Sequence, residues 1–389
     1  MKQNNTIILT SCALLLVSLF SMDLYNPSLP VITHALHASQ SIIRNLVIAY
    51  LFGAAVSQLF YGPLSDRFGR KPIIVFALCV CIIGNVVSVI ATTAWVLLFS
   101  RLIVGLGAGG CTVISRVILR DTFHDRHHLT RAFAYFAMAS TISPAFAPMI
   151  GGFLQTHFPW QSNFIFLNVI TLMMLIAILI LFTETIQNKL SHLNSKLFLQ
   201  GYKTVLSNRQ FLVYSVMSAL TFSITIGYYT INPFIFQNDL GFSPATNGLF
   251  YIIYAVGILI GTNVTKACVK KYAPESIVKI AAHFLFGISI VVTTLNLFGL
   301  FNVYTVLIPT FFIAVFFGVQ APSLIALGIA NFKENTGSAS AMQGMIKMLG
   351  PAIVLLAFAG VHVSKQLPLS LFFLIVSLLN VSCLALIKK

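Results

Sequence analysis

Eight residues of this 389-residue chain are acidic, and Asp23 differs from the others in its surroundings. The other seven fall in polar stretches or at the ends of apolar runs, whereas Asp23 lies inside the first apolar run. Apolar surroundings favour the neutral carboxyl group, which can take up a proton and release it when its surroundings change. Two plainer roles are open: Asp23 caps the chain break at Pro27 by a hydrogen bond, or it lies in water at the outer edge of the run.

Two basic residues, Arg101 and Lys347, also lie inside apolar runs. A cation in such surroundings is costly unless it is paired or functional. Arg101 either takes part in a proton pathway with Asp23 or fixes neighbouring helices through their backbone carbonyls. Lys347 has three open roles: it reaches toward the polar edge of its run, pairs with Asp23, or meets a negatively charged ligand group. Because two cations accompany one acid, a ligand with a negative group is favoured.

Polar aromatic residues recur along the apolar runs and could line a cavity for a small molecule. For each of them, packing in the interior or against lipid is the alternative. Together with the residues that follow Asp23, they predict a substrate-binding site of Tyr25, Asn26, Tyr135, Tyr228, Tyr254 and Lys347.

A loop of unusual composition, GPLSDRFGRKP, follows the second apolar run at residues 62–72. Its glycines permit a tight turn and close helix approach, and its acid can cap a helix or pair with a cation. An ion pair that forms in one conformation and breaks in another would act as a latch, and a plain basic loop is the alternative. The residues predicted to form this latch are Gly62, Asp66, Arg67, Gly69 and Arg70.

Small residues and prolines recur in the fourth and fifth apolar runs. Gly105 and Gly109 form a small-residue face on which two helices can approach closely. In the fifth run two prolines would bend a helix, and two glycines would let it press against a partner. These four residues are Pro144, Pro148, Gly151 and Gly152.

The elements that carry these residues are long apolar runs. Hydrophobic residues make up 58% of the chain and charged residues only 8%, against about a quarter charged in soluble proteins. Lipid must therefore surround most of the surface, and within lipid only helices satisfy the backbone of such runs. The runs lie near residues 7–32, 45–62, 72–93, 96–117, 132–155, 162–182, 210–232, 246–265, 277–298, 303–330, 338–361 and 367–387.

The runs form two sets of six, separated by the longest polar stretch. The sequence thus predicts an all-α membrane protein with twelve transmembrane helices in two pseudo-symmetric six-helix bundles. Residues 1–183 form the N-terminal bundle, 184–209 a cytoplasmic linker and 210–389 the C-terminal bundle. With the N-terminus inside, nineteen Lys and Arg residues fall on the cytoplasmic side and two outside, so both termini are predicted to be cytoplasmic.

Several classes of function are disfavoured by what the chain lacks. The net charge of +15 is scattered over short loops, without the basic face of a nucleic-acid-binding protein. The cysteines lie mostly in apolar runs and have no metal-ligand spacing, and three histidines in the loop after the fourth run lack partners for a metal site. No nucleotide-binding motif occurs. We expect neither an enzyme nor an ATP-driven pump, and no cofactor or metal.

The loop at 62–72 resembles the signature loop of the major facilitator superfamily. Residues 143–152 are similar to the helix 5 motif of its drug/proton antiporters, although Ala147 stands where glycine is frequent. With residues 23–30 and 337–341, the chain resembles the bicyclomycin/chloramphenicol-resistance branch of the twelve-helix drug/proton antiporters. The resemblance covers nearly the whole chain and is stronger in its first half. Lys347 departs from the family pattern, in which a neutral polar residue is usual.

The resemblance implies the major facilitator fold and a location in the bacterial inner membrane. Nothing in the sequence requires more than a monomer. The resemblance also implies export by alternating access, with a proton moving inward and with Asp23 and Arg101 in proton coupling. The predicted function is therefore proton-coupled export of small molecules. Two alternatives remain. One is a dedicated exporter of an endogenous metabolite, anionic or neutral, such as a siderophore, an amino acid or a sugar. The other is an importer, which the helix 5 motif disfavours.

Overall fold

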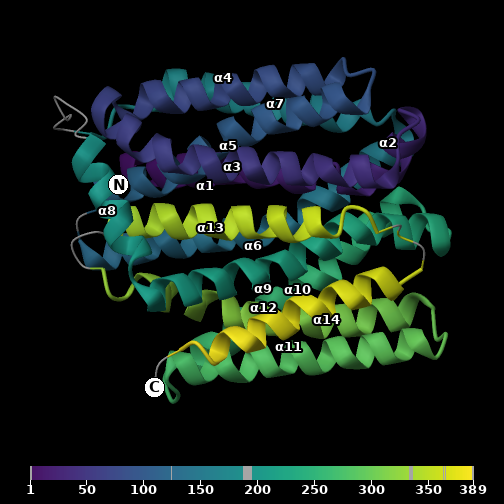
Figure 1. Ribbon diagram of the computed structural model, residues 1–389. Coiled ribbons are helices and arrows are strands. Elements are labelled where there is room, and N and C mark those ends of the chain that lie inside the picture. Colours follow the sequence, from purple (N-terminus) through teal and green to yellow (C-terminus); the bar gives the residue numbers. More distant parts are fainter. Residues whose placement is uncertain are drawn as a thin grey trace.

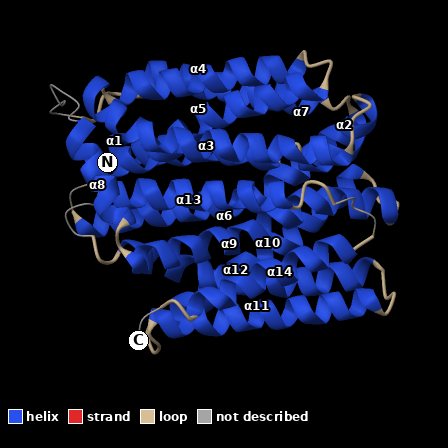
Figure 2. Cartoon of the chain, viewed as in Figure 1, coloured by secondary structure: helices blue, strands red, loops and turns tan. Residues whose placement is uncertain are grey.

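The computed structural model describes residues 2–123, 125–186, 195–332, 336–361, 363 and 365–387. Within these ranges the regular elements are all helical (Figure 2). The N-terminal half contains α1 (Lys2–Asp23), the short 3₁₀ turn η1 (Asn26–Ser28), α2 (Leu29–Ala35), α3 (Gln40–Phe68), α4 (Arg70–Val89), α5 (Ala94–Thr122), α6 (Arg126–His157) and α7 (Gln161–Leu181).

The C-terminal half begins after a polar connection that itself contains a helix. Its elements are α8 (Ser195–Leu206), α9 (Arg209–Pro233), the π-helical turn η2 (Phe234–Asp239), α10 (Pro244–Cys268), α11 (Pro274–Leu297), α12 (Val303–Ile329), α13 (Thr336–Ala357) and α14 (Leu367–Leu384). The predicted linker therefore includes the helix α8, and α9 begins at its last residue.

Twelve helical stretches in the described part of the chain are long and apolar enough to cross a membrane. They coincide with the twelve predicted runs, so the predicted all-α membrane fold is confirmed. The first stretch, Thr6–Ala35, combines α1, η1 and α2, because the chain turns once at Asn26–Ser28 and then continues. The seventh, Arg209–Asp239, combines α9 with η2.

Helix starts are set by local side-chain bonds. The side chains of Ser39, Thr93, Asn208 and Ser243 each accept a hydrogen bond from the backbone N–H three residues on, at the start of α3, α5, α9 and α10. Asn302 forms a capping box with Thr305 at the start of α12. Such caps satisfy N–H groups that have no partner within the helix.

The helices run side by side and form two bundles, one above the other in Figure 1. α1 to α7 form one bundle and α9 to α14 the other, and they meet where α6 packs on α10 and where α3 packs on α13. Both chain ends and α8 lie at one end of the molecule, and α2 lies at the other. We call these the α8 end and the α2 end.

The buried core differs between the two ends. In the half toward α2, one hydrophobic cluster extends across both bundles, from Leu24 and Leu46 to Tyr251 and Phe372. In the half toward α8, the buried residues divide into separate clusters within each bundle. Leu59 of α3 is an exception, since it packs on the cluster that joins α8 to α13. The bundles are thus joined most firmly at the α2 end.

Candidate functional site

Asp23 is the last residue of α1, directly before the turn at Asn26–Ser28. Its side chain is 1% exposed, and neither carboxylate oxygen has a hydrogen-bond partner among the described residues. It therefore neither caps the chain break nor lies in open water, which contradicts both plainer roles considered from the sequence. A buried carboxyl group without a donor is most stable when it is protonated.

Arg101 of α5 lies beside the same turn of α1. It is fully buried, and its guanidinium group donates a hydrogen bond to the carbonyl oxygen of Ser21, two residues before Asp23. The guanidinium carbon lies 4.5 Å from the ring centroid of Tyr25, 5.2 Å from that of Tyr50 and 5.6 Å from that of Phe164. Within the described chain Arg101 forms no ion pair with Asp23. Its contacts hold the end of α1 in position.

Four tyrosines of the C-terminal bundle face this region from α9 and α10. The rings of Tyr228 and Tyr254 stack with centroids 4.7 Å apart, and Tyr251 meets the ring of Tyr229 edge-on at the same distance. Asp23 is near enough to Tyr229 and Tyr251 to interact with both electrostatically. The predicted site residues Tyr228 and Tyr254 are therefore brought together, with two further tyrosines between them and the N-terminal bundle.

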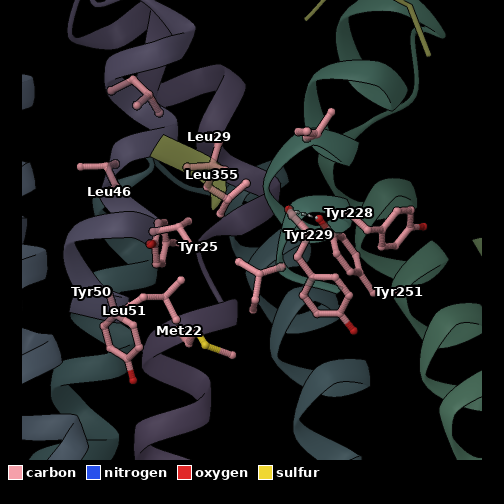
Figure 3. Close-up of a cluster of buried hydrophobic side chains, with 14 of the residues drawn as sticks. Met22, Tyr25, Leu29, Leu46, Tyr50, Leu51, Tyr228, Tyr229, Tyr251 and Leu355 are labelled. Carbon is pink, nitrogen blue, oxygen red and sulfur yellow. Dashed lines mark hydrogen bonds between the residues drawn. The ribbon is translucent and has the colours of Figure 1, made fainter. Parts of the chain in front are cut away.

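Figure 3 shows the two sides of this site. Met22, Tyr25 and Tyr50 project from the N-terminal bundle, and Tyr228, Tyr229 and Tyr251 lie opposite them. Among the predicted residues, Asn26 is also buried here, and its side-chain oxygen has no partner in the described structure. Asp23 thus lies in the interior between the bundles, where a movement of one bundle would change its surroundings.

The structure does not bring Tyr135 together with the other predicted site residues. Tyr135 lies in the half of α6 toward the α8 end and is 42% exposed, and its ring contacts Arg131, one turn earlier. It shares no contact with the tyrosine cluster of α9 and α10 among those described. The sequence could not show which way this side chain points, because α6 has polar and apolar residues on several sides.

A chain of hydroxyl groups leads from Arg101 toward the α8 end. Tyr50, beside Arg101, donates to the carbonyl of Ser18 at 2.6 Å, and its oxygen lies 3.3 Å from the Ser18 hydroxyl. The Ser18 hydroxyl lies 2.8 Å from that of Thr112. Ser115 then donates to the Thr112 carbonyl, and Ser11 donates to that of Ser115. The seam between α1, α3 and α5 is therefore polar for several turns.

The helix 5 motif lies within α6 and contacts both bundles. At Gly151 a Cβ atom would clash with the carbonyl oxygen of Leu24, the residue after Asp23, and at Gly152 it would clash with that of Pro244 in α10. Pro148 has no N–H, so the carbonyl of Pro144, one turn earlier, lacks its usual helical donor. The hydroxyl group of Tyr229 donates to that carbonyl at 3.2 Å. The predicted close packing of this motif is confirmed.

Lys347 lies midway along α13, and its ammonium nitrogen is 4.7 Å from the ring centroid of Phe222 in α9. No ion pair with Asp23 is present among the described residues. A second cation, Arg116, lies near enough to repel it. Arg116 is one of the nineteen cations that the sequence places on the cytoplasmic side, but it lies within α5, six residues before that helix ends. Both cations are partly exposed.

The predicted latch residues lie at the α8 end of the N-terminal bundle. Arg70 pairs with Asp66 at 2.6 Å and with Asp121 of α5 at 2.7 Å. Gly69, with a φ of 106°, makes the turn between α3 and α4. Arg67 lies over the ring of Phe68. The ion pairs of Arg70 thus join α3, α4 and α5 of one bundle.

Gly62 differs from the expectation of close helix approach. A Cβ atom there would meet only Val113, at an ordinary contact distance of 4.0 Å. The close contacts between α3 and α5 are made instead by Gly53, Gly105 and Gly109, so the small-residue face predicted in the fourth run is confirmed.

A cavity of about 670 Å³ lies elsewhere, between α11 and α12. It is lined mainly by apolar side chains that are about half exposed, including Phe284, Val291, Ile308 and Phe312. In a helix bundle within lipid, exposed apolar side chains of this kind face the membrane. We therefore assign this cavity to the lipid-facing surface rather than to the site between the bundles.

Comparison with known proteins agrees with this architecture. The family model of the Major Facilitator Superfamily matches residues 11–355. Multidrug resistance protein D of Escherichia coli K12 is 26% identical over 385 residues, which cover 98% of this chain and 95% of the relative. Multidrug resistance protein MdtL of Escherichia coli O17:K52:H18 is 29% identical over 349 residues, 89% of this chain and 86% of the relative.

The solved structures support the fold independently of close sequence similarity. A crystal structure of a D-xylose–proton symporter superimposes with a TM-score of 0.77 at 16% sequence identity, covering 96% of each chain. Together with the family match and the twelve membrane-spanning stretches, this similarity identifies a multi-pass membrane transporter of small molecules. The chain belongs to the major facilitator superfamily.

Proposed function

We propose that this protein is a proton-coupled exporter of small molecules in the bacterial inner membrane, with the α8 end and both termini in the cytoplasm. The observation that carries the proposal is Asp23, a buried carboxyl group that has no hydrogen-bond partner among the described residues, in the interior of a membrane transporter. An ionisable residue at such a depth is a candidate carrier of protons. Two multidrug resistance proteins among the relatives support the direction of transport.

In the proposed cycle, Asp23 is protonated from outside and releases its proton to the cytoplasm. In the described conformation the shared core covers Asp23 from the α2 end, which favours the protonated form. Arg101 acts as a positioning residue, since it holds the carbonyl of Ser21 beside Asp23. The hydroxyl groups of Tyr50, Ser18 and Thr112 offer a route toward the α8 end, because a hydroxyl group both donates and accepts hydrogen bonds.

Alternating access follows from the way the bundles meet. The core is common to both bundles toward α2 and divided toward α8, as expected of a state closed to the outside. We propose that Arg70 and its partners hold the N-terminal bundle rigid at the α8 end and close against the other bundle in the opposite state. The α6 motif, packed on Leu24 and on Pro244, would transmit the movement to the segment beside Asp23.

A dedicated exporter of an endogenous metabolite is the second candidate. It is favoured by Lys347 and Arg116, two cations of different bundles that form no ion pair within the described residues and that a purely cationic drug would have to approach. Both candidates share the proton carrier and differ in the charge of the substrate.

The substitution Asp23→Asn tests the proton carrier. In inverted membrane vesicles, substrate-driven proton efflux read by 9-aminoacridine fluorescence should fall to the background of vesicles without the protein. The variant should still insert and unfold at the wild-type temperature, because Asn is isosteric and neutral like the protonated acid. Asp125→Asn is the matched control: Asp125 is exposed at the start of α6, and Asn is an equally good cap there. Wild-type proton efflux in Asp23→Asn would exclude Asp23 as the carrier.

A further inference from the structure

Two cations on helices of different bundles are close enough to interact electrostatically. Arg116 belongs to α5 and Lys347 to α13, and each is partly exposed within a membrane-spanning helix. They interact as like charges. Of the eight acids in the chain, the seven in the described residues form no ion pair with either cation. The charge of the two cations is therefore not compensated by the described protein groups.

The surroundings of Lys347 add a polar donor and an apolar surface. Gln58 of α3 packs on Gly344, which lies one helical turn before Lys347 on the same face of α13. The Gln58 side chain is 2% exposed, and its amide nitrogen has no hydrogen-bond partner within the described structure. Phe222 lies against the ammonium group of Lys347. The site thus combines two cations, a buried N–H donor and an aromatic ring.

We infer that Arg116, Lys347 and Gln58 bind the negative head group of an organic anion, with its apolar body against Phe222. The inference rests on the proposed function only in taking the interior between the bundles as the substrate path. Bringing two cations together in low-dielectric surroundings is unfavourable unless an anion lies between them. Guanidinium, ammonium and amide N–H groups together match the oxygens of a carboxylate, a sulfonate or a phosphate.

This anion site is distinct from the position of Asp23. Arg101, beside Asp23, and Arg116 lie fifteen residues apart on α5, which corresponds to roughly 22 Å at the helical rise per residue. The substrate anion and the proton would therefore occupy different levels of the same interior. Because one cation comes from each bundle, relative movement of the bundles would separate the two cations and weaken their hold on the anion.

A matched pair of aromatic ions tests the inference by binding alone. Naphthalene-2-sulfonate and N-methylquinolinium have similar two-ring bodies and permanent opposite charges. Their binding to the full-length protein in non-ionic detergent would be measured from the shift in its thermal unfolding temperature, without a proton gradient. We expect the sulfonate to stabilise the wild-type protein and the quinolinium to have little effect. Lys347→Gln and Arg116→Gln should each raise the Kd for the sulfonate roughly tenfold.

Control variants separate the effect of the side-chain charge on binding from any effect of the substitution on folding. Lys347→Arg should retain sulfonate binding, and Arg209→Gln, which removes an exposed cation at the start of α9, should bind as the wild type does. Without ligand, the Gln variants should unfold no earlier than the wild type, because they relieve a like-charge repulsion. Lys347→Glu should reverse the preference toward the quinolinium.

Equal stabilisation by both ions, or an unchanged Kd in both Gln variants, would overturn the anion site. Because the assay uses no gradient, sulfonate binding that persists in Asp23→Asn supports the anion site even if the proton assignment fails. Loss of sulfonate binding in Lys347→Gln alongside normal proton coupling to other substrates would likewise support the site independently of Asp23.

Discussion

Ser18 is the residue on which the hydroxyl chain from Arg101 toward the α8 end depends, because its side chain bonds to both Tyr50 and Thr112. Ser18→Ala should slow proton-coupled transport about tenfold while leaving the unfolding temperature within a few degrees, as a lost hydrogen bond within a membrane bundle costs only about 0.6 kcal/mol. The measurement is the initial rate of proton efflux in inverted vesicles.

Ser88→Ala supplies the control for Ser18. Ser88 is also a fully buried serine, and its hydroxyl group lies 2.8 Å from that of Ser100, but this pair joins α4 to α5 away from the chain. The two variants lose a similar bond, so a common small fall in stability is expected in both. Equal transport rates in the two would show that protons do not use Ser18.

At the level of single residues, burial from solvent was easier to predict than contacts. The sequence identified Asp23, Arg101 and Lys347 correctly as charged groups within spanning helices, because an interruption of an apolar run is visible in any one sequence. It did not reveal Arg116, since a spanning helix needs only roughly 20 residues and α5 has 29. Gln58 gave no signal at all, because an uncharged amide in a helix does not show which neighbour it faces.

Among the helices, the close packing of α6 on the segment after α1 leads to a prediction about Gly151. Gly151→Ala would place a methyl group against the backbone carbonyl of Leu24, and any shift of the Leu24 backbone would move the adjacent Asp23. Overpacking of this kind costs roughly 1–3 kcal/mol, so both the unfolding temperature and the transport rate should fall. Thermal unfolding in detergent and proton efflux in vesicles measure the two effects.

Gly287→Ala is the matched control within α11. A Cβ atom there meets nothing within 4 Å, and alanine favours a helix by roughly 0.8–1.0 kcal/mol over glycine. The same substitution should therefore raise stability or leave it unchanged at Gly287 and lower it at Gly151. A fall of equal size in both variants would contradict the close packing of α6 on α1.

The hydrogen bonds of Glu184 at the start of α4 predict that stability depends on pH. Burial raises the pKa of Glu184, but hydrogen bonds from the backbone N–H groups of Arg70, Ile186, Lys71 and Thr185 outweigh it, and the pKa lies below its usual range. A pKa lowered by folding stabilises the protein above the unfolded value, about 4.3, and the stabilisation is lost as pH falls through the lower folded value. Acid should therefore loosen the hydrogen-bond network that joins the segment after α7 to the start of α4.

Glu184→Gln tests this reasoning through the difference in unfolding temperature between wild type and variant. At pH 7 the wild type should be the more stable, and the difference should shrink progressively below about pH 4.3. Because Glu184 is partly exposed, the effect should be small. A difference that stays constant from pH 7 to pH 3 would show that the charge of Glu184 contributes nothing to the network.

For the whole molecule, the twelve helices and their division into two bundles could be predicted because lipid demands long apolar helices with satisfied backbones. The packing of α6 on α10 and of α3 on α13 could not, since many pairs of apolar helices are compatible with the same runs. The sequence could not determine the facing of Tyr135 for the same reason. Which side chains meet between the bundles depends on helix rotation, which the sequence alone does not determine.

The charges in the interior also predict how transport responds to the membrane potential. Export of a monovalent anion in exchange for one inward proton moves two charges in the same direction, and each contributes about 2.3 kcal/mol per 100 mV. Collapsing the potential at a fixed pH gradient should therefore slow the export of naphthalene-2-sulfonate strongly. Exchange of a monovalent cation for a proton moves no net charge. Sulfonate export that is indifferent to the potential would contradict one-for-one exchange.

The hydrogen bond from Tyr229 to the carbonyl of Pro144 shows that the prolines of α6 also affect the contact between the two bundles. Without Pro148, the helix would supply its own N–H donor to this carbonyl, which would then be a weaker acceptor for Tyr229. The carbonyl that lacks a donor within α6 thus binds the opposite bundle through the hydroxyl group of Tyr229. A bond of this strength is easily broken and re-formed, and it suits a joint that must open with every turnover. Restoring an N–H group at position 148 would strengthen the hydrogen bonding within α6 and weaken the contact between the bundles.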